Sequence, residues 1–203
     1  MEFLMYRYVF LFRFEDIEVL KNDIFNHLSQ VHIDKEKESY ILSQEVTIRK
    51  SENAIYFNKL NAVEIKIYKK DNIFGIFTNK VKNIRQYKFL MNYSPINLVN
   101  NEFMIKVFKN GFSNNLTKIS IEVDKKYGQE TLELMGNRLF DIDIFKDLDI
   151  FNYNSAWHIK EYSFQPSLSK YCIKIKEPNR IEFNKKILSD VGDKIIQSII
   201  LIL

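Results

Sequence analysis

The chain contains three histidines, so any histidine-based mechanism must draw on His27, His32 and His158. His27 and His32 are five residues apart, at the end of an expected helix and in the loop beyond it, and Tyr40 follows. An acid, a base and a hydroxyl could together cleave RNA through its own 2′-hydroxyl without a metal. We take His27, His32 and Tyr40 as a speculative catalytic set. The alternative is that His27 caps the helix and His32 is an ordinary loop residue.

Four aspartates form the densest acidic cluster of the sequence: Asp141, Asp143, Asp147 and Asp149. Paired carboxylates can hold Mg²⁺ for phosphoryl transfer. The order Asp-Ile-Asp-Ile over residues 141–144, however, is typical of a strand with one solvated face. The segment also lacks the glycine and terminal glutamate of a calcium-binding loop. We therefore expect neither a metal site nor another cofactor.

The common enzyme signatures are missing. The sequence has no GxxxxGK[ST], no GxGxxG and no GxSxG pattern, which disfavours the usual nucleotide-dependent and acyl-transfer enzymes. Cys172 lies in an apolar alternation, which is more typical of a packed thiol than of a nucleophile. The sequence therefore favours a protein without catalytic activity.

The most distinctive local feature is basic. Residues 66–88 carry one acid, Asp71, against seven cations: Lys66, Lys69, Lys70, Lys80, Lys82, Arg85 and Lys88. Four aromatic residues lie within this stretch and a fifth directly follows it: Tyr68, Phe74, Phe77, Tyr87 and Phe89. Cations neutralise phosphates and exposed aromatic rings stack on unpaired bases, so the segment is a candidate nucleic-acid surface. The alternative is a solvated sheet face whose aromatic side chains turn inward.

The charge composition bears on both interpretations of this basic segment. Residues 61–120 carry 10 basic and 3 acidic groups, whereas the whole chain has a net charge of +4. With 24 Lys against 6 Arg, contact with the nucleic-acid backbone is expected rather than recognition of bases. Abundant Lys, Asn, Ile and Phe with 5 Gly and 3 Pro are also typical of an AT-rich genome. Codon usage is thus a second explanation for the basicity.

Cysteine usage and apolar runs suggest a cytoplasmic location. A single cysteine allows no intramolecular disulfide. Residues 1–14 are interrupted by Arg7 and Arg13 and lack a signal-peptide cleavage site, and residues 195–203 are about half of the ~20 residues that a membrane-spanning helix needs. We expect no membrane association.

Hydrophobic periodicity predicts an α+β fold of mainly antiparallel sheet with three to four helices. Strands are expected at residues 5–14, 40–49, 54–57, 62–68, 73–78, 102–108, 116–123, 142–150, 156–164, 170–175 and 180–183. Helices are expected at residues 15–29, 81–91, 128–140 and 193–203. The order of elements is compatible with two similar ferredoxin-like halves, an N-terminal half at 1–96 and a C-terminal half at 97–203, or with one compact domain.

A strand–helix opening followed by a histidine broadly resembles the ferredoxin-like ribonucleases that process CRISPR transcripts. Those enzymes carry a glycine-rich C-terminal segment. Here only Gly192 remains after Gly136, so the chain is not assigned to that family.

Two functions follow as expectations. The first is a non-catalytic intracellular binding or assembly protein that contacts a protein partner or a second copy of itself, because residues 6–14 and 195–203 offer a large apolar surface. The second is an RNA-binding or metal-independent RNA-cleaving protein that binds single-stranded nucleic acid on its lysine-rich surface.

Overall fold

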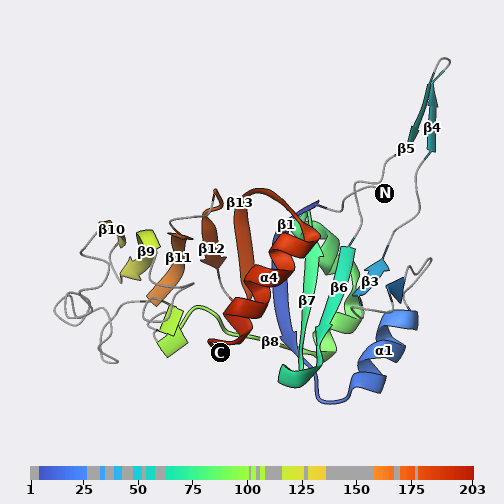
Figure 1. The fold of residues 1–203 in the computed structure, drawn as a ribbon, viewed down its shortest axis with the longest axis horizontal. Helices are drawn as coiled ribbons and strands as arrows, with labels where there is room; N and C mark the ends of the chain where they lie inside the picture. Colours follow the sequence, from blue (N-terminus) through green and yellow to red (C-terminus); the bar gives the residue numbers. More distant parts are fainter. Residues whose placement is uncertain are drawn as a thin grey trace. The chain divides into compact units, whose positions relative to one another are not determined.

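Figure 1 shows the computed structural model of the chain. It describes residues 5–26, 33–34, 39–42, 48–51, 54–57, 63–100, 102–103, 106–107, 116–125, 128–135, 158–166, 170–176 and 178–203. These residues form antiparallel strands and helices, which confirms the α+β class. Within them, no helix is both long and apolar enough to span a membrane.

The chain divides into two compact units. The first comprises Met1–Ile96 and Lys186–Ser189, and the second comprises Asn97–Lys185 and Asp190–Leu203. The strands of each unit are described in turn.

The sheet of the first unit is antiparallel throughout. Its strand order is β1 (Met5–Arg13), β7 (Ile73–Thr78), β6 (Val63–Tyr68), β3 (Ser39–Leu42) and β2 (Ile33–Asp34). The short β8 (Ser94–Pro95) also pairs with β1, and β4 (Ile48–Ser51) and β5 (Ala54–Phe57) form a separate ribbon. Figure 1 shows β1, β7, β6 and β3 side by side.

Helical segments connect these strands. They are α1 (Ile17–Asn26) and three 3₁₀ helices, η1 (Lys69–Asp71), η2 (Val81–Gln86) and η3 (Lys88–Asn92). The Asp16 carboxylate caps α1, since its Oδ1 accepts the backbone N–H of Glu18 at 2.7 Å. Leu20 and Ile24 lie on one face of α1 and are fully buried.

One face of this sheet and the helical segments enclose a continuous core. Alternate residues of three strands point into it: Phe10, Phe12, Phe14, Val63, Ile65, Ile67, Phe74 and Ile76. Leu20 and Ile24 from α1 and Tyr87, Phe89 and Leu90 from the 3₁₀ segments pack on them. The rings of Phe12 and Phe74 stack at 5.3 Å between centroids, so β1 and β7 are joined by side chains as well as by their backbones.

The opposite face of β6 corrects an expectation. Alternation over residues 62–68 predicts one apolar and one solvated face, but Glu64 and Lys66 are 5% and 4% exposed. They form an ion pair, with 3.7 Å between Lys66 Nζ and Glu64 Oε1, and each also bonds to Ser189. Mutual pairing allows charged side chains to be buried where periodicity alone predicts water.

The sheet of the second unit is also antiparallel. Its order is β10 (Gly128–Met135), β9 (Leu116–Lys125), β11 (His158–Pro166), β12 (Ile173–Lys176) and β13 (Arg180–Leu188), followed by α4 (Ser189–Ile200). Alternate side chains of β11, β12 and β13 are buried: Tyr162, Phe164, Ile173, Ile175, Ile181 and Phe183. The Tyr162 hydroxyl donates to the Leu98 carbonyl at 3.0 Å.

Three predicted elements of the chain are wrong. The helix expected over 128–140 is strand β10 from Gly128 to Met135, because pairing with β9 along its whole length outweighs a helical spacing of apolar residues. The strand expected over 102–108 contains helical residues, and Lys106 pairs with Glu102 one helical turn away at 3.0 Å. The predicted hairpin of 102–108 with 116–123 is therefore wrong as well, since β9 pairs with β10 and β11. The expected strand at 142–150 lies outside the described residues.

Candidate functional site

Of the predicted reactive set His27, His32 and Tyr40, the structure describes only Tyr40. His27 and His32 lie outside the described residues. Tyr40 is on β3, is 5% exposed, and its ring meets that of Phe25 edge-on at 5.8 Å. Tyr40 is therefore part of the core, and its role in cleavage stays a prediction.

The other candidates for chemistry are the acidic cluster and the cysteine. Asp141, Asp143, Asp147 and Asp149 lie outside the described residues. Where the structure does describe the chain, no group of three or more His, Cys, Asp and Glu side chains could hold a metal ion. Cys172 is half-buried beside β12, with its backbone N–H donating to Asn184 Oδ1 at 3.2 Å.

The seven predicted nucleic-acid contacts do not form one surface. Lys66 is buried, and its ammonium lies 5.2 Å from the centroid of the Phe77 ring. Lys69 and Lys70 lie in η1 before β7, whereas Lys80 follows the end of this strand. A six-residue strand spans about 20 Å, so these lysines belong to separate sites.

The remaining cations lie on the arm formed by η2 and η3. A 3₁₀ helix has three residues per turn, so residues three apart lie above one another. Hydrogen bonds between residues three apart join the N–H of Tyr87 to Ile84, of Leu90 to Tyr87 and of Tyr93 to Leu90, at 3.0, 3.1 and 3.2 Å. Tyr87, with φ −93° and ψ 86°, interrupts the helical backbone between η2 and η3. Each of the two segments therefore has its own rows of side chains.

Two of these rows have opposite character. The inner row packs on the core and consists of Val81, Ile84, Tyr87 and Leu90. The row beside it is exposed and consists of Lys82, Arg85, Lys88 and Met91. We call Lys82, Arg85 and Lys88 the basic row. Lys82 and Arg85 lie about 6 Å apart along η2, from a rise of about 2 Å per residue, and Lys88 begins η3 after the break at Tyr87.

The segment that carries the basic row contains no acid of its own. The sequence has no Asp or Glu between Asp71 and Glu102. In the described part of the chain, none of the three cations of the row forms an ion pair. Exposed cations that form no ion pair create a local positive potential that attracts a polyanion.

The aromatic residues of this segment do not form a stacking surface. Phe74, Phe77, Tyr87 and Phe89 are 0%, 1%, 7% and 4% exposed. The Tyr87 and Phe89 rings contact each other edge-on at 6.1 Å. The alternative reading of the sequence, with aromatic side chains turned inward, is correct for these four, and they hold the arm on the sheet.

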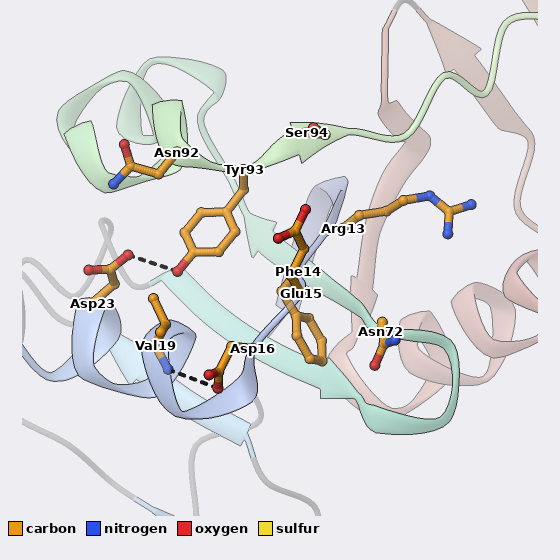
Figure 2. Close-up of a pocket in the computed structure, with 10 residues that line it drawn as sticks. All are labelled: Arg13, Phe14, Glu15, Asp16, Val19, Asp23, Asn72, Asn92, Tyr93 and Ser94. Atoms are coloured by element: carbon orange, nitrogen blue, oxygen red, sulfur yellow. Dashed lines mark hydrogen bonds between the residues drawn. The ribbon is translucent and has the colours of Figure 1, made fainter.

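A pocket of about 600 Å³ opens at the C-terminal end of η3 (Figure 2). We call it the α1 pocket. One wall comes from α1 and the residue that caps it, with Asp16, Val19 and Asp23. The facing wall is Asn92, Tyr93 and Ser94, and the remaining lining residues are Arg13, Phe14, Glu15 and Asn72. Figure 2 shows Tyr93 reaching across toward α1.

A hydrogen bond joins the two walls of the α1 pocket. The Tyr93 hydroxyl donates to Asp23 Oδ2 at 2.7 Å, and its ring packs edge-on against Phe74 at 5.1 Å. Burial, followed by the hydrogen bond to Asp23 and the charge of that residue, raises the pKa of Tyr93. The hydroxyl is therefore protonated at neutral pH, and the pocket presents three carboxylates (Glu15, Asp16 and Asp23) against one guanidinium, Arg13.

Sequence reasoning missed the α1 pocket. Its walls come from segments about 70 residues apart, and no spacing in the sequence connects Asp23 to Tyr93. The basic row, in contrast, had a signal, since Lys82, Arg85 and Lys88 recur at every third residue. No protein-family model matches the chain, and no curated protein matches it.

Proposed function

We propose that this chain is a non-catalytic binding protein that contacts the phosphate backbone of single-stranded nucleic acid through the basic row. The observation that carries the proposal is the recurrence of three exposed cations, at every third residue, on an arm whose intervening side chains are anchored in the core. Because the buried row fixes the backbone, only the cationic side chains need to be ordered when a strand binds. The uncompensated charge of the segment supports the same function.

The proposal sets a scale for the binding. Each phosphate that is neutralised on a single strand contributes about −0.7 to the slope of log K against log salt concentration. Three cations therefore give a slope of about −2. Contact with the backbone alone predicts little dependence on base sequence, apart from any site that takes an individual base.

Fluorescence anisotropy with labelled single-stranded RNA and DNA across a salt series tests the proposal. The variant Lys82→Glu/Arg85→Glu/Lys88→Glu should weaken binding by at least tenfold at low salt. The matched control Lys170→Glu/Lys186→Glu/Lys194→Glu changes the net charge equally, at exposed positions outside the segment that forms the arm. Equal binding by both variants would refute the proposal.

Gels run in parallel without metal show whether the strand is cleaved. Cleavage that is lost in His27→Ala and His32→Ala would support the catalytic prediction.

A second candidate function is assembly with a protein partner or another copy of the chain. The apolar segments first expected to mediate it are largely internal, since Tyr6, Phe10, Phe12, Phe14, Ile196 and Ile199 are buried. Other apolar side chains are exposed: Val19 at 53%, Phe25 at 44%, Met91 at 88% and Leu201 at 85%. Such side chains form an interface only where they lie together in a contiguous patch. Light scattering of the purified chain tests it, and a monomer at all concentrations would exclude self-assembly.

Two finer expectations remain proposals. One is that the parts at 1–96 and 97–203 are separate domains with similar ferredoxin-like architecture, and the other is a cytoplasmic location. Neither is needed for the basic row to bind a strand.

A further inference from the structure

We infer that the α1 pocket receives one unpaired base of the bound strand, and that it favours bases with an exocyclic amino group. This inference rests on the proposed function, because the basic row has to hold the strand beside the pocket. It adds base preference to a contact that otherwise depends on charge alone.

The position of the pocket relative to the basic row is the first argument. Lys88 is the first residue of η3, and Asn92, its last residue, lines the pocket. Four residues at about 2 Å each place these two positions about 8 Å apart along the arm. This distance corresponds to about two stacked nucleotides at about 3.4 Å per phosphate. A strand that follows the row thus reaches the pocket within its next few nucleotides.

The size and walls of the pocket are the second argument. A volume of about 600 Å³ lies within the range of about 300–1,000 Å³ typical of small-ligand sites, which is ample for a base and its sugar. Phe14 and Val19 contribute apolar surface, and Asn72, Asn92 and Ser94 contribute hydrogen-bonding groups. A paired base cannot enter such a pocket without leaving its duplex, so the pocket selects a single strand.

The charge of the pocket is the third argument. Glu15, Asp16 and Asp23 repel phosphate, so the backbone stays on the basic row and only an uncharged base enters. Carboxylates accept hydrogen bonds, and the amino group of cytosine is a donor where uracil has an acceptor oxygen. The Tyr93 hydroxyl is already committed to Asp23. An acceptor-rich pocket therefore favours cytosine over uracil.

Binding of oligocytidine and oligouridine of equal length tests the inference, since both are pyrimidine strands with the same backbone charge. We expect the wild-type chain to bind oligocytidine about fivefold or more tightly, within the range for a base-edge contact. The variant Asp16→Asn/Asp23→Asn should lose this preference while keeping the salt slope. Asparagine keeps both the helix cap and an acceptor for Tyr93, so the fold is preserved. Circular dichroism and the unfolding midpoint check this.

The possible outcomes separate the two proposals. Absence of salt-dependent binding to either strand refutes the proposed function. Salt-dependent binding without a preference for cytidine refutes only the inference, as does a preference that persists in the double variant. Tighter binding of both strands by the double variant, with the preference for cytidine retained, would show that the two carboxylates only repel the backbone, and this result also overturns the inference.

Discussion

The Ser189 hydroxyl donates a hydrogen bond of 2.6 Å to Glu64 Oε2, although 125 residues separate them in sequence. Lys66 Nζ completes the arrangement, since it lies 3.5 Å from the Ser189 carbonyl oxygen and 3.7 Å from Glu64 Oε1. Glu64 and Lys66 are both almost fully buried. The first residue of α4 is thus joined by hydrogen bonds to a buried ion pair of β6.

Removing the cation of this pair should strongly destabilise the chain. Lys66→Met leaves the Glu64 carboxylate buried without its ion-pair partner, and such losses cost about 3–5 kcal/mol. Urea denaturation followed by circular dichroism measures the change. The exposed Lys70→Met should change the unfolding free energy by less than about 0.5 kcal/mol. The double variant Glu64→Leu/Lys66→Met should recover much of the loss, and a double variant as unstable as Lys66→Met would contradict this account.

Tyr6 should be replaceable by phenylalanine without loss of stability at neutral pH. Its hydroxyl is buried near Glu64, and its distances and angles to the described residues do not satisfy hydrogen-bond geometry. Removing an unsatisfied buried hydroxyl should stabilise the chain by about 1 kcal/mol. Tyr162→Phe is the matched control, because it removes the bond to the Leu98 carbonyl and should destabilise by about 1 kcal/mol. Similar effects of the two substitutions on the unfolding free energy would contradict the prediction that the Tyr162 hydroxyl stabilises the chain and the Tyr6 hydroxyl does not.

Alkaline pH should unfold the chain partly through Tyr6. Burial, followed by the charge and proximity of Glu64, raises the pKa of this phenol. In the unfolded chain the phenol loses its proton near pH 10, whereas the folded chain retains it. Stability is therefore fully present below about pH 10 and falls as the pH rises above it. The Tyr6→Phe variant should show a shallower decline in its urea midpoint between about pH 9 and 11, and an unchanged slope would exclude Tyr6 as a contributor.

The loss of stability at low pH should depend on Glu161 in the second unit. Burial opposes ionisation of this carboxylate, but hydrogen bonds and charge from Lys174 and Lys176, at 2.5 and 2.6 Å, lower its pKa overall. The resulting stability is present above about pH 4.3, the usual value for glutamate, and is lost as the pH falls through the lower folded value. Glu161→Gln should lower the urea midpoint at pH 7 and flatten its decline below pH 5. An equal decline in both proteins would contradict the prediction.

The sequence predicts strands best where local alternation and burial agree. The expected bounds 54–57 and 73–78 match β5 and β7, and β1 differs by one residue. The prediction failed at 128–140, because apolar spacing there fits a helix as well as a strand and only the partner strand β9 decides. Lys66 was wrongly predicted to be exposed for a similar reason. Its charge suggests a position in solvent, whereas its hydrogen-bond partner Ser189 is 123 residues away in the sequence. The basic row could be predicted because its three-residue spacing is visible within one short segment. The α1 pocket could not, because its walls come from segments that are distant in the sequence.

Asn72 should tolerate glycine but not a β-branched residue. It is the only described residue other than glycine with a positive φ, at 53° with ψ 42°, and its carbonyl accepts the Phe14 N–H at 3.0 Å. Left-handed backbone costs a residue with a Cβ about 1–2 kcal/mol, and asparagine offsets this by local hydrogen bonding better than valine can. Asn72→Gly should therefore keep the unfolding free energy within about 0.5 kcal/mol, whereas Asn72→Val should lower it by at least about 1 kcal/mol. Because the same turn supplies one lining residue of the α1 pocket, Asn72→Gly also tests whether its side chain or only its backbone matters for binding cytidine. Equal stability of the two variants would show that the turn relaxes to another conformation.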